Sequence, residues 1–197
     1  MNTETVRAFV AVKLPSSWVE PLARLQQKIE RELPSACVRW SRPENLHVTL
    51  RFLGNTARET LPALKAALDS VCVRFRPLTL RSGDLGAFPN AERPRVVWVG
   101  LEGEVETLQR LAREISAAAG AFGDHEERRP FAPHLTLGRL PPRRGAKARL
   151  LGRALRQVKA PRLEPFEARA VCLIQSVLTP QGPNYSDLSA HALSAAE

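Results

Sequence analysis

Apolar residues along this chain follow two spacings. In short runs they fill the run or fall at every second position, which is typical of strands. We expect strands at residues 7–14, 38–41, 46–53, 78–85, 95–101, 131–140 and 168–178, with a short last one at 185–188. In longer runs they fall at every third or fourth position, which is typical of helices. We expect helices at residues 17–33, 61–71, 104–119 and 147–158, and a tail at 190–197.

Polar residues mark where several of these elements begin and end. Gly54 and Asn55 predict a turn after the third strand. Two helix starts have the spacing of a capping box: Ser17 with Glu20, and Thr56 with Glu59. Strand pairs alternate with helices, without the glycine-rich loop of a nucleotide-binding βαβ unit. This order favours an α+β fold with antiparallel sheets.

A four-residue pattern occurs twice. His47-Val48-Thr49-Leu50 returns as His134-Leu135-Thr136-Leu137, 87 residues later, and each copy lies on an expected strand that precedes an expected helix. We therefore expect a single domain, residues 1–197, made of two similar lobes that carry the motifs at 47–50 and 134–137.

The motif places an imidazole and a hydroxyl side by side. Residues i and i+2 of a strand share a face, so His47 lies beside Thr49, and His134 lies beside Thr136. One such histidine could be a half-buried strand residue bonded to a backbone carbonyl. The chance of finding the whole pattern twice in this composition is on the order of one in a thousand, which favours a functional pair.

Two such motifs suit the opening of a cyclic phosphodiester. One neutral imidazole can take a proton from the attacking water, and one imidazolium can give a proton to the leaving oxygen. Threonine hydroxyls can hold the phosphate between the rings, and an arginine can neutralise its charge. A zinc site is the less favoured alternative. Neither motif carries a carboxylate, and the other two histidines, His125 and His191, have no matching spacing.

One residue follows each motif at the same distance. Arg139 lies five positions after His134 and is the candidate arginine, with a solvated loop residue as the alternative. Phe52 lies five positions after His47, and an odd separation puts it on the opposite face of a regular strand. It can stack a base only if the strand twists or bulges at Arg51 and Phe52, and otherwise it belongs to the core.

Several segments together carry a resemblance to a known family: RAFVAVKLP from Arg7, WSRPENLHVTLRFLG from Trp40, RVVWVGL from Arg95, FAPHLTLGR from Phe131, SVL from Ser176 and GPNY from Gly182. They resemble the two-histidine (2H) phosphoesterases. The closest resemblance is to the bacterial and archaeal RNA 2′,3′-cyclic phosphodiesterases, first named 2′-5′ RNA ligases. The resemblance covers most of the chain, and residues 120–129 are its least familiar part.

This resemblance implies two pseudo-symmetric lobes, each an antiparallel sheet with helices packed outside, around a central cleft that takes one H-x-T-x strand from each lobe. It implies an enzyme without metal or other cofactor that converts RNA 2′,3′-cyclic phosphate ends to 2′-phosphates. In some members the enzyme also joins tRNA halves reversibly through a 2′-5′ bond. It implies that His47 and His134 are catalytic and that Thr49, Thr136 and Arg139 contact the phosphate.

The roles of the two histidines follow from the implied product. A 2′-phosphate requires O3′ to leave, and our hypothesis is that His47 protonates O3′ while His134 deprotonates water. The swapped assignment is the alternative. Two other hypotheses stay open for the whole protein. One is the same fold acting on a small cyclic nucleotide, an ADP-ribose cyclic phosphate or a 2′-5′ oligonucleotide. The other is an RNA-end-binding module of low turnover.

Charge strengthens the expectation of an anionic partner. The chain has 29 Lys and Arg against 20 Asp and Glu, a net charge of +9. Eleven of the basic residues, and no acidic one, fall between residues 128 and 162. On the helix expected there, we predict an RNA-facing side with Lys147, Arg149, Arg153 and Arg156, and a core side with Leu150, Leu151, Leu155 and Val158. A solvated helix face is the alternative.

The remaining composition predicts a cytoplasmic monomer. Three cysteines, Cys37, Cys72 and Cys172, are too few and too far apart for a disulfide framework, and we expect buried thiols in a reducing compartment. No apolar run reaches 18 residues, so neither a spanning helix nor a signal peptide is expected. No amphipathic stripe is left without a partner.

Overall fold

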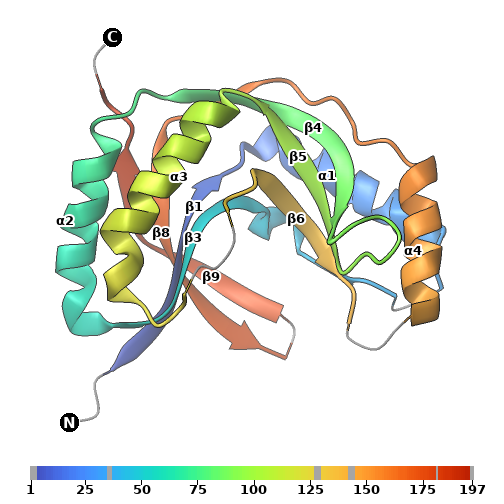
Figure 1. The fold of residues 1–197 in the computed structure, drawn as a ribbon, viewed down its shortest axis with the longest axis horizontal. Coiled ribbons are helices and arrows are strands. Elements are labelled where there is room, and N and C mark those ends of the chain that lie inside the picture. Colours follow the sequence, from blue (N-terminus) through green and yellow to red (C-terminus); the bar gives the residue numbers. More distant parts are fainter. Residues whose placement is uncertain (1–3, 35–36, 127–129, 142–144, 181, 196–197) are drawn as a thin grey trace.

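Two antiparallel sheets lie side by side in the computed structural model, with helices packed on their outer faces (Figure 1). The structure describes residues 4–34, 37–126, 130–141, 145–180 and 182–195. Sheet A has the order β3-β1-β8-β9, and sheet B has the order β2-β6-β5-β4-β7. The α+β fold with antiparallel sheets is confirmed.

The strands match most of the expected ones, with different ends. Sheet A consists of β1 (Thr5–Lys13), β3 (His47–Ala57), β8 (Ala170–Thr179) and β9 (Gly182–Ala192). Sheet B consists of β2 (Arg39–Trp40), β4 (Leu78–Phe88), β5 (Val96–Gly103), β6 (His134–Arg139) and β7 (Phe166–Ala168). The α-helices are α1 (Ser16–Arg31), α2 (Leu61–Cys72), α3 (Val105–Ala119) and α4 (Gly145–Gln157). Short 3₁₀ turns cover Pro43–Asn45, Arg58–Thr60 and Gly120–Phe122.

Each sheet is covered by one pair of helices. α2 and α3 pack on each other and on sheet A, while α1 and α4 lie on sheet B (Figure 1). The apolar stripe of α1 carries Trp18, whose indole N–H donates to the carbonyl of Glu164 at 2.9 Å. Gln26 is also buried, and its side-chain amide donates to the carbonyl oxygens of Ser41 and Leu137. These bonds fix α1 to both β2 and β6.

The lobes are not the two halves of the sequence. α1 follows a strand of sheet A but covers sheet B, and α3 follows a strand of sheet B but covers sheet A. The hairpin β4–β5 lies in sheet B, and the hairpin β8–β9 lies in sheet A. Each lobe therefore combines elements from both halves of the chain, and the two lobes share one continuous apolar core.

Both predicted capping boxes are wrong. α1 begins directly after Pro15, and no side chain caps its first turn. Thr56 is fully buried inside β3, because that strand continues past the expected turn to Ala57. α2 begins after Thr60 instead, again without a side-chain cap.

The predicted turn at Gly54 and Asn55 is wrong, because β3 continues through both residues. Instead, the loop that carries Asp124 is attached to the strand there. Asp124 accepts hydrogen bonds from the backbone and side-chain amides of Asn55, at 2.7 and 2.8 Å. Gly54 has a φ of 73°, and a Cβ atom there would lie 2.0 Å from Asp124 Oδ1. The glycine thus serves the close approach of this loop rather than a chain reversal.

The predicted tail is wrong for its first residues. β9 pairs with β8 as far as Ala192, and Leu193 is buried. His191 is buried as well, where its Nδ1 meets Asp69 of α2 at 2.6 Å and its Nε2 meets Ser189 at 2.8 Å. These contacts attach the end of the chain to α2.

The three cysteine side chains are buried, as expected, and form no disulfide. Burial raises the pKa of the Cys72 thiol to about 12, so it is not a reactive thiolate near neutral pH. Among the described residues, no helix is long and apolar enough to cross a membrane.

Candidate active site

A bulge in β3 decides which side chains of the first motif face the same way. Thr49 and Arg51 lie opposite successive residues of β1, so Leu50 has no partner of its own. Leu50 and Arg51 are both buried, which breaks the alternation of the strand. Phe52 is therefore returned to the face of His47 and Thr49, and it is 39% exposed there. The bulge lies at Leu50, just before the place where we expected it, and it brings Phe52 out of the core.

β6 carries the same bulge at the equivalent place. Thr136 and Gly138 lie opposite successive residues of β5, so Leu137 is the unpaired residue. Arg139 is thereby returned to the face of His134 and Thr136 and is exposed there. One bulged residue in each strand thus explains why the residue five positions after the histidine shares the histidine's face.

Each motif histidine is held from behind by a backbone carbonyl two residues earlier. His47 Nδ1 lies 2.7 Å from the oxygen of Asn45, and His134 Nδ1 lies 2.6 Å from the oxygen of Ala132. A carbonyl oxygen only accepts, so Nδ1 carries the hydrogen in both rings. Nε2 is left as the nitrogen that can give or take a proton.

His47 lies among aromatic side chains of sheet A. Its ring stacks on Phe9 at 4.7 Å and meets the edge of Tyr185 at 5.5 Å, measured between ring centroids. Burial lowers the pKa of His47 below its ordinary value, the bond to Asn45 opposes this, and the positive charge of His134 lowers it further. The two histidines are thus close enough for their charges to interact.

His134 has matching surroundings in sheet B. Its ring meets Phe88 edge-on at 5.0 Å and Trp98 at 6.4 Å. Burial again lowers the pKa, the hydrogen bond to Ala132 opposes this, and here the charge of Arg139 lowers it. Both rings therefore favour the neutral form in the absence of an anion.

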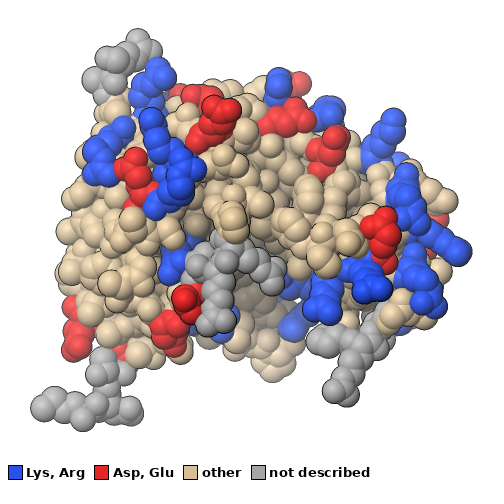
Figure 2. All heavy atoms as spheres, in the orientation of Figure 1, with Lys and Arg blue, Asp and Glu red and all other residues tan. Residues whose placement is uncertain are grey.

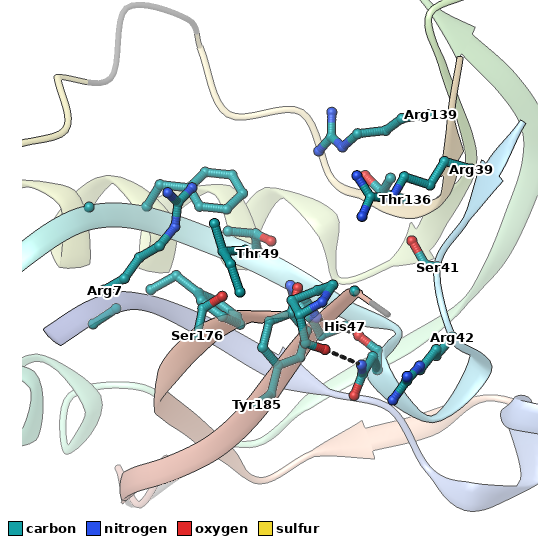
Figure 3. Close-up of a pocket in the computed structure, with 18 of the residues that line it drawn as sticks. Arg7, Arg39, Ser41, Arg42, His47, Thr49, Thr136, Arg139, Ser176 and Tyr185 are labelled. Carbon is teal, nitrogen blue, oxygen red and sulfur yellow. Dashed lines mark hydrogen bonds between the residues drawn. The ribbon is translucent and has the colours of Figure 1, made fainter. Parts of the chain in front are cut away.

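Both motifs open into one cavity of about 550 Å³ between the sheets (Figure 3). All six candidate residues line it: His47, His134, Thr49, Thr136, Arg139 and Phe52. β3 and β6 belong to different sheets but approach each other along the cavity. The structure therefore brings together the residues that lie 87 positions apart in the sequence.

The cavity is strongly positive. Four arginines line it, Arg7, Arg39, Arg42 and Arg139, and none of its described lining residues is Asp or Glu. Such a lining attracts anions and gives no set of carboxylates for a metal ion. Among the residues that the structure describes, no three or more His, Cys, Asp or Glu side chains gather where they could hold one.

Several lining residues were not among the candidates. They are Arg7, Arg39, Arg42, Asn45, Ser41, Ser176, Tyr185 and His125. Most lie on strands or turns beside the motif strands, so only the pairing of strands could have found them. Asn45 is the exception, because it lies two residues before His47. It also donates from its side-chain amide to the carbonyl of Pro183 at 3.1 Å, which ties the first motif to the β8–β9 hairpin.

Both halves of the chain match one family. The description "LigT like Phosphoesterase" fits residues 12–98 and again residues 99–185. The chain belongs to the LigT-like phosphoesterase family. Each matched segment of this LigT-like protein contains one H-x-T-x motif, so the expected family and the expected repeat are both confirmed.

Relatives of this LigT-like phosphoesterase extend over nearly its whole length. An RNA 2′,3′-cyclic phosphodiesterase of Aeropyrum pernix is 36% identical over 168 residues, which are 85% of this chain and 92% of the relative. One of Archaeoglobus fulgidus is 36% identical over 184 residues, 93% and 98% of the two chains. A crystal structure of a Thermus thermophilus protein has a TM-score of 0.75 at 28% identity and covers 97% of this chain and 100% of that one. Escherichia coli LigT in complex with NADP+ has a TM-score of 0.72 at 27% identity, with 97% and 99% covered.

Proposed function

We propose that this protein hydrolyses the 2′,3′-cyclic phosphate ends of RNA to 2′-phosphates by acid–base catalysis without a metal ion. The observation that carries the proposal is the pair of imidazoles, each anchored through Nδ1 and each lining one cavity with a threonine of its own motif. The relatives of Aeropyrum pernix and Archaeoglobus fulgidus are named RNA 2′,3′-cyclic phosphodiesterases, which supports the substrate class.

The proposed reaction uses the two imidazoles in turn. His134 Nε2 takes a proton from water, whose oxygen attacks phosphorus, while protonated His47 gives its proton to the departing O3′. The P–O3′ bond breaks, and the phosphate stays on O2′. Thr49 and Thr136 donate to the non-bridging oxygens, and Arg139 offsets their charge. With a ribose 5′-hydroxyl in place of water as the attacking group, the same step would join RNA ends through a 2′-5′ bond, and its reversal would release the cyclic phosphate and the 5′-hydroxyl.

The charge of the cavity favours an RNA chain over a small cyclic nucleotide. A cyclic phosphate carries one negative charge, whereas Arg7, Arg39 and Arg139 all line the cavity. Each further phosphodiester of a chain adds one negative charge to match them. RNA ends from cut tRNA are one such substrate class.

The basic face of α4 supports the same substrate. Arg149, Arg153 and Arg156 are exposed on it, and basic side chains gather over this helix (Figure 2). Two details differ from the sequence expectation. Leu150 is 37% exposed rather than in the core, and Arg162 is paired with Glu102 and Asp84 at 2.7 and 3.2 Å. Four of the eleven basic residues of the run, Arg128, Arg129, Arg143 and Arg144, lie outside the described residues.

We further propose that the enzyme acts as a cytoplasmic monomer. Every group assigned to the reaction comes from one chain, and three buried thiols suit a reducing compartment. Sedimentation of the protein at micromolar concentration tests the monomer.

Phosphorus NMR of adenosine 2′,3′-cyclic phosphate with the enzyme in EDTA tests the proposed reaction. We expect conversion to the 2′-phosphate alone, and a rate lower by about 10²–10⁴ in His47→Ala and in His134→Ala. Circular dichroism and melting temperature control for folding of the variants. A mixture of 2′- and 3′-phosphates, dependence on added metal, or full activity in either variant would contradict the proposal. If the mononucleotide is inert, a short RNA with a cyclic end is the second substrate, and its inertness would favour the binding module.

A further inference from the structure

Two arginines face each other across neighbouring strands at the rim of the cavity. In the β2–β6 ladder, Arg39 lies directly opposite Arg139. Residues opposite each other in an antiparallel pair are about 4.5–5.5 Å apart at Cα and point to the same face. Both side chains line the cavity, and Figure 3 shows them side by side near Thr136.

This arrangement is unfavourable unless an anion binds there. Like charges directly opposite in a sheet repel each other. Elsewhere on the surface, arginines such as Arg74 and Arg162 are paired with carboxylates. Within the described residues, neither Arg39 nor Arg139 forms an ion pair, and no carboxylate lines the cavity.

The backbone that carries Arg39 is held firmly in place. β2 has only two residues, but the backbone N–H of Ser41 donates to the carbonyl of Leu137 at 2.8 Å. Gln26 donates to that same carbonyl and to the carbonyl of Ser41, at 2.9 and 2.8 Å. A Cβ at Gly138 would lie 2.8 Å from the Trp40 ring, so the glycine allows β2 to pair closely beside β6. A backbone that is already fixed adds no ordering cost of its own when Arg39 binds a phosphate.

Arg39 is not needed to bind the reacting phosphate. That group already has two imidazoles, two hydroxyls and Arg139, and it carries a single negative charge. In RNA with a cyclic end, the nearest further phosphate is the one on O5′ of the same terminal nucleoside. Just before β2, the Cys37 thiol donates a hydrogen bond to the backbone carbonyl of Lys147 at 3.8 Å. Thus the start of the basic α4 helix lies beside this rim.

We propose that Arg39 binds the 5′-phosphate of the terminal nucleoside while Arg139 binds the reacting cyclic phosphate. The pair would then read two successive phosphates of one chain, and it would select RNA ends over cyclic mononucleosides. This inference rests on the proposed function, because it takes the reacting phosphate to lie between the two motifs.

The test compares two substrates that differ only at O5′: adenosine 2′,3′-cyclic phosphate and its 5′-phosphorylated form. We expect the wild-type enzyme to prefer the 5′-phosphorylated substrate by about tenfold or more in kcat/KM, since arginine–phosphate hydrogen bonds are charge-assisted. Arg39→Gln should reduce this preference to about twofold or less. Arg76→Gln, which removes an exposed charge outside the cavity lining, should keep the full preference.

Three outcomes would overturn the inference: no preference in the wild-type enzyme, an unchanged preference in Arg39→Gln, or the same loss of preference in Arg76→Gln. If neither nucleotide is turned over, a short RNA with a cyclic end decides whether the proposed function fails, and binding still tests the site. Calorimetry with adenosine 3′,5′-bisphosphate and adenosine 3′-phosphate should show the tighter binding of the bisphosphate in the wild type and its loss in Arg39→Gln. Equal affinities for the two nucleotides would overturn the second phosphate site.

Discussion

The two motif strands repeat each other in backbone and differ in the side chains that follow. In both, a leucine after the threonine is unpaired, the histidine is held through Nδ1, and two aromatic rings of the same sheet surround it. The residue five positions after the histidine is Phe52 in β3 and Arg139 in β6. The repeated part thus places the two imidazoles to which we assign proton transfer, and the varied part sets which side chains lie beside them.

The residue just after the unpaired leucine differs as well. In β3 it is Arg51, which is buried and donates to the carbonyl of His125 at 2.9 Å, so it holds a loop that lines the cavity. The ring of His125 in turn meets the edge of Phe52 at 5.9 Å. In β6 it is Gly138, which makes room for β2 and so for Arg39. We therefore propose that the first lobe offers aromatic surface for a base and that the second offers charge for phosphate.

The two histidines give the strongest test of this comparison. Both are held through Nδ1 in the same way, but our mechanism makes His47 the acid and His134 the base. Bis(4-nitrophenyl) phosphate has a leaving group that needs no proton, whereas O3′ of a cyclic phosphate does need one. Relative to the wild type, His47→Ala should lose about 10²–10⁴ on the cyclic substrate and much less on the nitrophenyl ester, because only the acid is dispensable there. His134→Ala should lose activity on both. Absorbance of nitrophenolate gives the rates.

Rescue of His134→Ala instead of His47→Ala would show that the roles are swapped. Rescue of both or of neither would contradict a division of the pair into one acid and one base. Arg76→Gln serves as the matched control and should behave as the wild type on both esters.

A second prediction contrasts the residues that follow the motifs. Arg139→Gln should lower kcat/KM for adenosine 2′,3′-cyclic phosphate by about 10²–10³, because it removes charge stabilisation at the reacting group. Phe52→Leu should lower it by only about tenfold, through KM, because base stacking is lost. The Phe52→Leu effect should shrink on ribose 2′,3′-cyclic phosphate, which has no base, while the Arg139→Gln effect should persist. Equal losses for Phe52→Leu on the two substrates would contradict a stacking role.

Pattern and spacing predicted the elements, the repeat and the paired motifs, because these depend on residues close in sequence. The bulges were beyond prediction, since an unpaired Leu50 or Leu137 is visible only once the neighbouring strand is known. The same holds for Arg39, whose importance comes from lying opposite Arg139. Thr56 shows the opposite failure: a local capping pattern was overridden by burial within a strand.

The smallest expected effect concerns the pKa values of the two histidines. Burial lowers both, and a different neighbouring charge lowers each one further. For His134 it is the charge of Arg139, and for His47 it is the charge of His134. Arg139→Gln should therefore raise the pKa of His134, since protonation no longer meets a positive neighbour. The pKa of His47 should not rise with it. His134 is then charged over a wider pH range, and its charge disfavours protonation of His47 in this coupled pair. NMR titration of the two imidazole C–H signals, without phosphate in the buffer, measures both. A parallel rise at the two rings would mean that Arg139 acts on the cavity as a whole, and the electrostatic difference between the motifs would disappear.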